Sequence, residues 1–111
     1  MANPKHLRIL QQGVETWNAW RKQHRNITPD FRNAPLSLTN LCRADMHNAN
    51  LSGADLHGVS FREANLQGAD LTDTTGLLPR QLAGADVSDA RLPAKFPLFT
   101  ALDHVQDLSD S

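Results

Sequence analysis

Residues 44–73 read ADMHN ANLSG ADLHG VSFRE ANLQG ADLTD, which is a run of consecutive groups of five. Each group has a large apolar residue at its centre and a small residue two positions earlier. The residue between them is polar and usually Asp or Asn. Working outward, the apolar centres are Leu36, Leu41, Met46, Leu51, Leu56, Phe61, Leu66 and Leu71. The small positions are Ala34, Thr39, Ala44, Ala49, Ala54, Val59, Ala64 and Ala69.

A period of five fits neither an α-helix, whose period is 3.6, nor a flat strand, whose period is 2. It predicts a chain that turns a corner after every five residues, so that four sides close a coil of about 20 residues. The centre and the small residue then both point inward, by the alternation of an extended chain. Gly53, Gly58 and Gly68 fall two positions after a centre. We expect unusual backbone dihedrals there, which glycine tolerates.

The five-residue frame breaks after Leu71, because residues 72–76 supply no apolar centre. One extra residue near Thr75 restores the frame, with centres at Leu77, Leu82, Val87 and Leu92. Arg80 then falls on an inward position, so we expect that side to be irregular, with a helical turn beginning at Pro79. The repeat from Leu36 to Leu92 amounts to three coils, about 14 Å tall at the spacing of a β ladder.

The pattern in ADMHN, ANLSG, ADLHG, ANLQG and ADLTD resembles the pentapeptide repeat family. This resemblance implies an all-β solenoid, a short right-handed quadrilateral β-helix. The stretch TGLLPRQLAGADVSDARLP also resembles a segment that is frequent in bacterial members, in which the repeat breaks and resumes. The departures from the pattern are Thr39, Val59 and Arg80.

Both ends of a short solenoid need caps. Asn3 and Pro4 are suited to begin a helix, and an apolar stripe follows at helical spacing. We therefore predict an N-terminal capping helix over residues 4–24. Its stripe comprises Leu7, Leu10, Val14, Trp17 and Arg21. A short C-terminal helical segment, with Phe99, Leu102, Val105 and Leu108 on one face, is predicted to cap the last coil or to pair with another chain.

The chain is expected to form a single domain, 1–111. Residues 1–30 are the capping helix and linker, residues 31–92 the repeat, and residues 93–111 a C-terminal cap or a linker to a further domain. No segment approaches the roughly 20 apolar residues of a membrane span, and no signal peptide is recognised, so a cytoplasmic location is expected. Whether the chain is complete or an excised domain is left open.

No catalytic, cofactor-binding or metal-binding residues are predicted. The single cysteine, Cys42, cannot form an internal disulfide or a cysteine-based metal cage. His47 and His57 are ten residues apart and should face opposite ways, while His6, His24 and His104 lie in the capping segments. Outward Asp and Asn residues should form columns, namely Asp45 with Asn65 and Asp86, and Asn50 with Asp70 and Arg91. Arg43 should lie one coil from Glu63 as an exposed pair. We therefore do not expect an enzyme.

The formal net charge is −1, unevenly distributed. Residues 1–33 carry six Lys or Arg against two Asp or Glu, whereas residues 34–92 carry four against seven. The basic cluster of Arg21, Lys22, His24 and Arg25, close to Trp17 and Trp20, could be a nucleic-acid patch. Because the net charge of the chain is close to neutral, we favour the other interpretation, in which these residues form a solvated helix end and the tryptophans lie in the cap.

The expected function is a non-catalytic structural or protein–protein interaction module, with another protein or a further domain as partner. The chain is either a small complete protein or the N-terminal domain of a larger bacterial protein. Homodimerisation through the C-terminal segment is a second possibility. The alternative function is DNA mimicry with binding to DNA gyrase, which the resemblance implies for some members. Three coils span fewer than about five base pairs at 3.4 Å each, and the repeat is only weakly acidic, so we disfavour this alternative.

Overall fold

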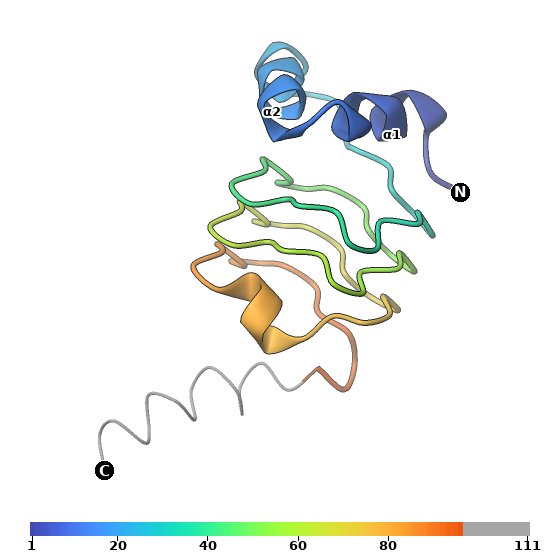
Figure 1. Ribbon diagram of the computed structural model, residues 1–111, viewed down its shortest axis with the longest axis vertical. Coiled ribbons are helices and arrows are strands. Elements are labelled where there is room, and N and C mark those ends of the chain that lie inside the picture. Colours follow the sequence, from blue (N-terminus) through green and yellow to red (C-terminus); the bar gives the residue numbers. More distant parts are fainter. Residues whose placement is uncertain (97–111) are drawn as a thin grey trace.

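The computed structural model describes residues 1–96 of this chain. Within that range it has two α-helices, α1 (Pro4–Gln11) and α2 (Val14–Gln23), and one 3-10 helix, η1 (Pro79–Leu82). The two α-helices lie across one end of a stack of coils, and η1 lies in the last coil (Figure 1). The predicted C-terminal helical segment lies outside the described residues. No helix in residues 1–96 is long and apolar enough to cross a membrane.

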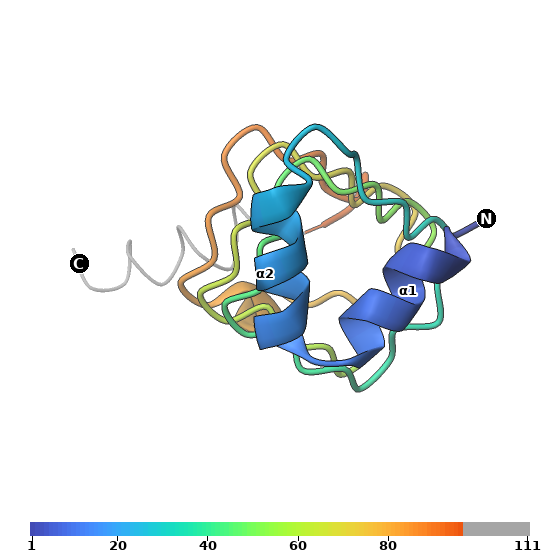
Figure 2. The ribbon, with the colours of Figure 1, turned by 90° about the horizontal axis from the view of Figure 1, so that it is seen from above.

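The N-terminal segment forms two helices, so the prediction of one helix over residues 4–24 is wrong in this respect. Gly13 separates them with a φ of 111°, which glycine adopts readily because it lacks Cβ. The predicted start is confirmed: the Asn3 side chain accepts hydrogen bonds from the backbone N–H groups of Lys5 and His6. Because of the break, α1 and α2 run in different directions over the first coil (Figure 2).

Successive coils pair through isolated parallel bridges, and residues 1–96 contain no continuous strand. Most of the bridges join residues 20 apart in the sequence. The all-β description is therefore not confirmed as such. Most residues of each side form the turn at the corner, and one residue per side forms a bridge to the next coil. The first side begins at Asp30 and Phe31, one group of five before Leu36. The bridges form four columns: Asp30–Asn50–Asp70–Arg91, Pro35–Asp55–Thr75, Asn40–Ser60 and Asp45–Asn65–Asp86.

Most corners are tight turns in which the C=O of a centre accepts a hydrogen bond from the N–H of the next small residue. The distance is 3.0 Å from Ala54 to Leu51 and 2.9 Å from Ala69 to Leu66. At the corner after Leu71, the Thr74 hydroxyl donates to the C=O of Leu71 instead. The third residue of the turn has a positive φ, as in a type II turn. The glycine prediction is thereby confirmed, and a positive φ recurs at the other corners between residues 30 and 91, except on the irregular side that contains η1. The corner residues with positive φ are Asn33, Leu38, Arg43, Asn48, Gly53, Gly58, Glu63, Gly68, Asp73, Gly84 and Asp89.

The Asp or Asn of each group has a local structural role. Its side-chain oxygen accepts a hydrogen bond from the backbone N–H two residues later, at 3.0 Å from Gln67 to Asn65 and 2.9 Å from Thr72 to Asp70. This side-chain turn leads the chain into the corner. The Thr72 hydroxyl also donates to Asp70 and lowers the pKa of that carboxyl group. The recurrence of Asp and Asn at this position is therefore explained by hydrogen bonds to the local backbone, and no binding partner is needed to account for it.

The inward positions form one continuous core, which confirms the predicted frame through Leu82; the last two predicted centres, Val87 and Leu92, are only partly buried against it. Every centre from Phe31 to Leu71 is at most 3% exposed, and Leu56 is fully buried. The alanines at the small position are at most 1% exposed, whereas Thr39 is half-buried. Since burying one Leu side chain contributes about 1.5–3 kcal/mol, this column is the main source of stability.

The extra residue in the frame lies between Thr75 and Gln81. Thr75 still bridges Asp55, whereas Phe61 donates its N–H to the C=O of Gln81, one residue further along than in the coil above. Arg80 is exposed and lies in η1, which confirms the irregular side. The Gln81 side chain crosses the gap in the ladder. Its Nε2 donates to the C=O of Leu56 at 2.8 Å and of Val59 at 2.7 Å, and its Oε1 accepts from the N–H of Leu78 at 2.6 Å.

Candidate functional site

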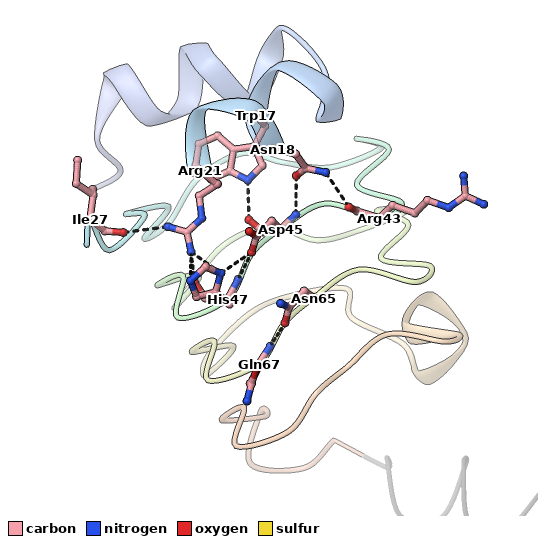
Figure 3. A network of polar contacts seen from close by, with 9 residues as sticks. All are labelled: Trp17, Asn18, Arg21, Ile27, Arg43, Asp45, His47, Asn65 and Gln67. Atoms are coloured by element: carbon pink, nitrogen blue, oxygen red, sulfur yellow. Dashed lines mark hydrogen bonds and ion pairs between the residues drawn. The ribbon is translucent and has the colours of Figure 1, made fainter. Parts of the chain in front are cut away.

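The first coil has no coil above it, and α2 supplies hydrogen bonds to one of its sides. Trp17 Nε1 donates to the C=O of Asp45 at 2.8 Å, and the N–H of Asp45 donates to Asn18 Oδ1 at 2.8 Å. Asn18 Nδ2 donates to the C=O of Arg43 at 3.0 Å (Figure 3). In lower coils a neighbouring coil pairs with these backbone groups. Side chains of α2 therefore take the place of a missing coil.

Arg21 is the most buried charged residue of this contact, at 1% exposed. Its Nη1 donates to the C=O of Ile27 at 2.9 Å, and its Nη2 donates to the C=O of His47 at 2.6 Å. Nη2 also contacts the His47 ring, whose Nδ1 lies 2.5 Å from Asp45 Oδ1. Arg21 Nε is buried and has no hydrogen-bond partner among residues 1–96. Burial lowers the pKa of Arg21, and the nearby Asp45 carboxylate partly offsets this effect.

A second contact, from the α1 region, covers the side that begins at Asp30. The N–H of Asp30 donates to His6 Nδ1 at 3.0 Å, and its C=O accepts from the N–H of Asn3 at 2.9 Å. His6 is 6% exposed and lies against Trp20 and Phe31, with ring centroids 5.2 and 6.4 Å away. Burial lowers the pKa of His6, so Nδ1 is held in its unprotonated, accepting form.

The bridge residue of the second side is a proline. Pro35 has no N–H to present at the open end of the stack, whereas Asp30 and Asp45 have theirs bonded by His6 and Asn18. An unpaired donor at the edge of a β ladder invites pairing with other chains, and proline removes that donor. The cap therefore combines direct hydrogen bonding on two sides with a missing donor on a third.

A pocket of about 400 Å³ lies between the C-terminal end of α2 and the first two coils. Its wall contains three basic side chains and a single carboxylate. Lys22 and Arg25 are exposed, whereas Arg21 is buried. The donors available there are guanidinium, ammonium, amide and imidazole groups, which suit an anion. The lining residues are Arg21, Lys22, Arg25, Asp45, His47, Asn65 and Gln67.

Several predictions about outward side chains are confirmed. The bridges produce both predicted columns, and Arg43 Nε lies 3.1 Å from Glu63 Oε1, with the side chains 79% and 52% exposed. His47 and His57 lie in different columns, each paired with the Asp two residues earlier.

No group of three or more metal-ligating side chains gathers within residues 1–96. Cys42 Sγ lies 3.1 Å from Ser60 Oγ, and no base is bonded to the thiol in the described chain. The absence of a catalytic site stays a prediction.

The basic cluster predicted at the end of the helix is divided by the fold. Trp17 is fully buried in the cap, as predicted, and Trp20 is half-buried with the His24 ring stacked on it at 4.6 Å. Arg21, in contrast, is part of the contact with the coil and is not solvated. The sequence placed Arg21 on the apolar stripe, and that was the signal of its burial. The roles of His6 and Asn18 had no such signal, because their partners are backbone groups of a distant coil.

Comparison with known proteins gives one family. The model of the family described as pentapeptide repeats matches eight copies, over residues 30–62 and 40–75. A comparison with curated proteins and one with solved structures gave no match. The matched residues are those in which the structure has apolar centres inward, a bonded Asp or Asn and a positive φ at each corner. Residues 30–75 of this chain thus carry the repeats that the pentapeptide repeat family model describes.

Proposed function

We propose that this chain is a non-catalytic module that docks another protein or a further domain. We also infer that its stack of coils is the right-handed, four-sided β-helix that the family resemblance implies. The observation that carries the proposal is the filled core: the centres from Phe31 to Leu71 and the alanines between them occupy the inside of the stack with almost no exposed area. A filled solenoid presents stiff outer faces, and such faces suit protein recognition.

The distribution of polar groups supports a binding role over a catalytic one. The repeated Asp and Asn side chains are engaged in backbone hydrogen bonds, as at Asn65 and Asp70, and the histidines of the coil are paired with their own Asp. Catalysis would need a nucleophile or base held within reach of a substrate cavity. Such an arrangement is not among the contacts described for residues 1–96.

The test is cross-linking in cells that express the intact chain, followed by identification of the captured partner. Leu56→Met, which keeps the core filled, serves as the folded control, and Leu56→Asp serves as the unfolded one. A partner captured by the wild-type chain and by Leu56→Met, but not by Leu56→Asp, supports docking. Capture of nothing beyond the chain itself would contradict it.

DNA mimicry remains the competing function, and a gyrase supercoiling assay tests it separately. The exposed outer face carries Arg43 and Arg62 among its acidic residues, and Arg91 ends one outward column. A duplex mimic needs a continuous negative surface, because the phosphate charge dominates what DNA-binding proteins recognise. We therefore expect no inhibition of supercoiling at micromolar protein.

A further inference from the structure

We propose that the pocket at the C-terminal end of α2 binds a carboxylate-rich segment of the docked partner. This proposal rests on the docking function above and assigns it a site. The pocket is defined by Arg21, Lys22 and Arg25 on the cap side and by His47 and Gln67 on the coil side. It is thus formed jointly by the cap and by two coils.

The buried guanidinium of Arg21 is the first reason. Its hydrogen bonds go to the carbonyl oxygens of Ile27 and His47 and to the His47 ring, and its Nε has no partner in the described chain. The nearby carboxylate, Asp45, is hydrogen-bonded to His47. A buried cation without a directly bonded carboxylate is costly, and a nearby negative charge reduces that cost. An anion in the pocket would supply that charge.

The second reason is the pair of exposed basic side chains at the rim of the pocket. Lys22 and Arg25 lie on the exposed rim, where they can follow a flexible segment with several carboxylates. The side chain of Gln67 on the coil wall makes no hydrogen bond within residues 1–96, so its amide N–H groups can donate. Surface ion pairs are individually weak, so several carboxylates on one segment are needed for measurable binding.

The cap favours an acidic peptide over a nucleic acid. Binding of single-stranded nucleic acid usually relies on exposed aromatic rings on which bases stack. Trp17 is fully buried, and Trp20 is half-buried under the His24 ring. The formal net charge of −1 also provides no extended basic track, so any polyanion is attracted only locally.

The experiment uses the intact chain and a fluorescein-labelled hexaglutamate peptide, followed by fluorescence anisotropy at about 50 mM salt. The double variant Lys22→Gln, Arg25→Gln removes both exposed positive charges of the pocket rim. Its matched control, Arg8→Gln, Arg62→Gln, removes two exposed charges outside the pocket. We expect the pocket variant to weaken binding about tenfold, since two ion pairs are lost, and the control to change it less than about twofold. Gln67→Glu should weaken it too, because it places a carboxylate in the pocket wall.

Equal losses in the pocket and control variants would overturn the site, as would undetectable binding at millimolar peptide. Competition by sodium acetate at the same carboxylate concentration would show a free-anion site and overturn the peptide claim. A thymidine oligonucleotide that binds through Lys22 and Arg25 while hexaglutamate does not would also overturn it. Partner cross-linking that survives the Lys22 and Arg25 substitutions would reject this site and leave the docking function standing.

Discussion

Gln81 spans the gap that the extra residue leaves in the ladder, and its replacement by methionine tests that role. Gln81→Met keeps the length and volume of the side chain but removes its donor and acceptor. Three hydrogen bonds are lost, to the C=O of Leu56, the C=O of Val59 and the N–H of Leu78. If the amide of Gln81 replaces a ladder bond, the coil should lose stability without losing its fold.

The expected magnitude follows from what each partner has left. Leu56 keeps the turn bond from the N–H of Val59 at 3.1 Å, and the exposed Leu78 can bind water. The C=O of Val59 has no other partner within residues 1–96, and an unpaired, partly buried carbonyl costs about 1–3 kcal/mol. We therefore expect the free energy of unfolding to fall by about 2 kcal/mol, which corresponds to roughly 8–16 °C in Tm for a domain of this size.

The assay is thermal and urea unfolding followed by circular dichroism. The control is Gln67→Met, because the Gln67 side chain makes no hydrogen bond in the described chain and lies outside the core. This control should change the free energy of unfolding by less than about 0.5 kcal/mol. If Gln81→Met and Gln67→Met unfold at the same urea concentration, the hydrogen bonds of the Gln81 amide do not contribute to the pairing of these two coils.

Three further predictions address the core, the cap and one corner. Leu56→Asp should unfold the domain, because it places an unpaired charge in a fully buried position at a cost of several kcal/mol. His57→Ala, at an exposed neighbour, should leave the melting temperature nearly unchanged. A normal melting transition for Leu56→Asp would contradict the frame. Burial lowers the pKa of His6, so its contribution to stability is complete above the unfolded value of about 6.5. It is lost progressively as the pH falls from that value to the lower pKa of the folded state. The wild-type Tm should therefore fall more between pH 7.5 and 5.5 than that of His6→Gln, which keeps an acceptor for Asp30; parallel pH profiles would refute this. Leu38 has a φ of 65° and is 82% exposed. Asparagine tolerates this left-handed conformation better than leucine, so Leu38→Asn should raise the free energy of unfolding in urea melts by about 1 kcal/mol. A loss of stability would show that the exposed leucine makes a favourable contact.

The repeat could be interpreted from the sequence because each of its groups solves the same local problem. A centre such as Leu56 and a small residue such as Ala54 alternate inward, and an Asp or Asn bonds the backbone that enters the corner. These interactions span two or three residues, so their signature is local and repeats every five. The frame, the columns, the exposed Arg43–Glu63 pair and the irregular side at Arg80 all followed from that period.

The cap and the site were decided by the tertiary structure. The sequence determined that helical residues precede the coil, but the division at Gly13 and the contacts of His6, Asn18 and Arg21 depend on which backbone groups the first coil leaves unpaired. Gln81 similarly acquires its role from carbonyl groups more than 20 residues away. A period reports contacts that recur along the chain, whereas the ends and the break of a solenoid are unique. Their hydrogen bonds exist only once the coils are stacked.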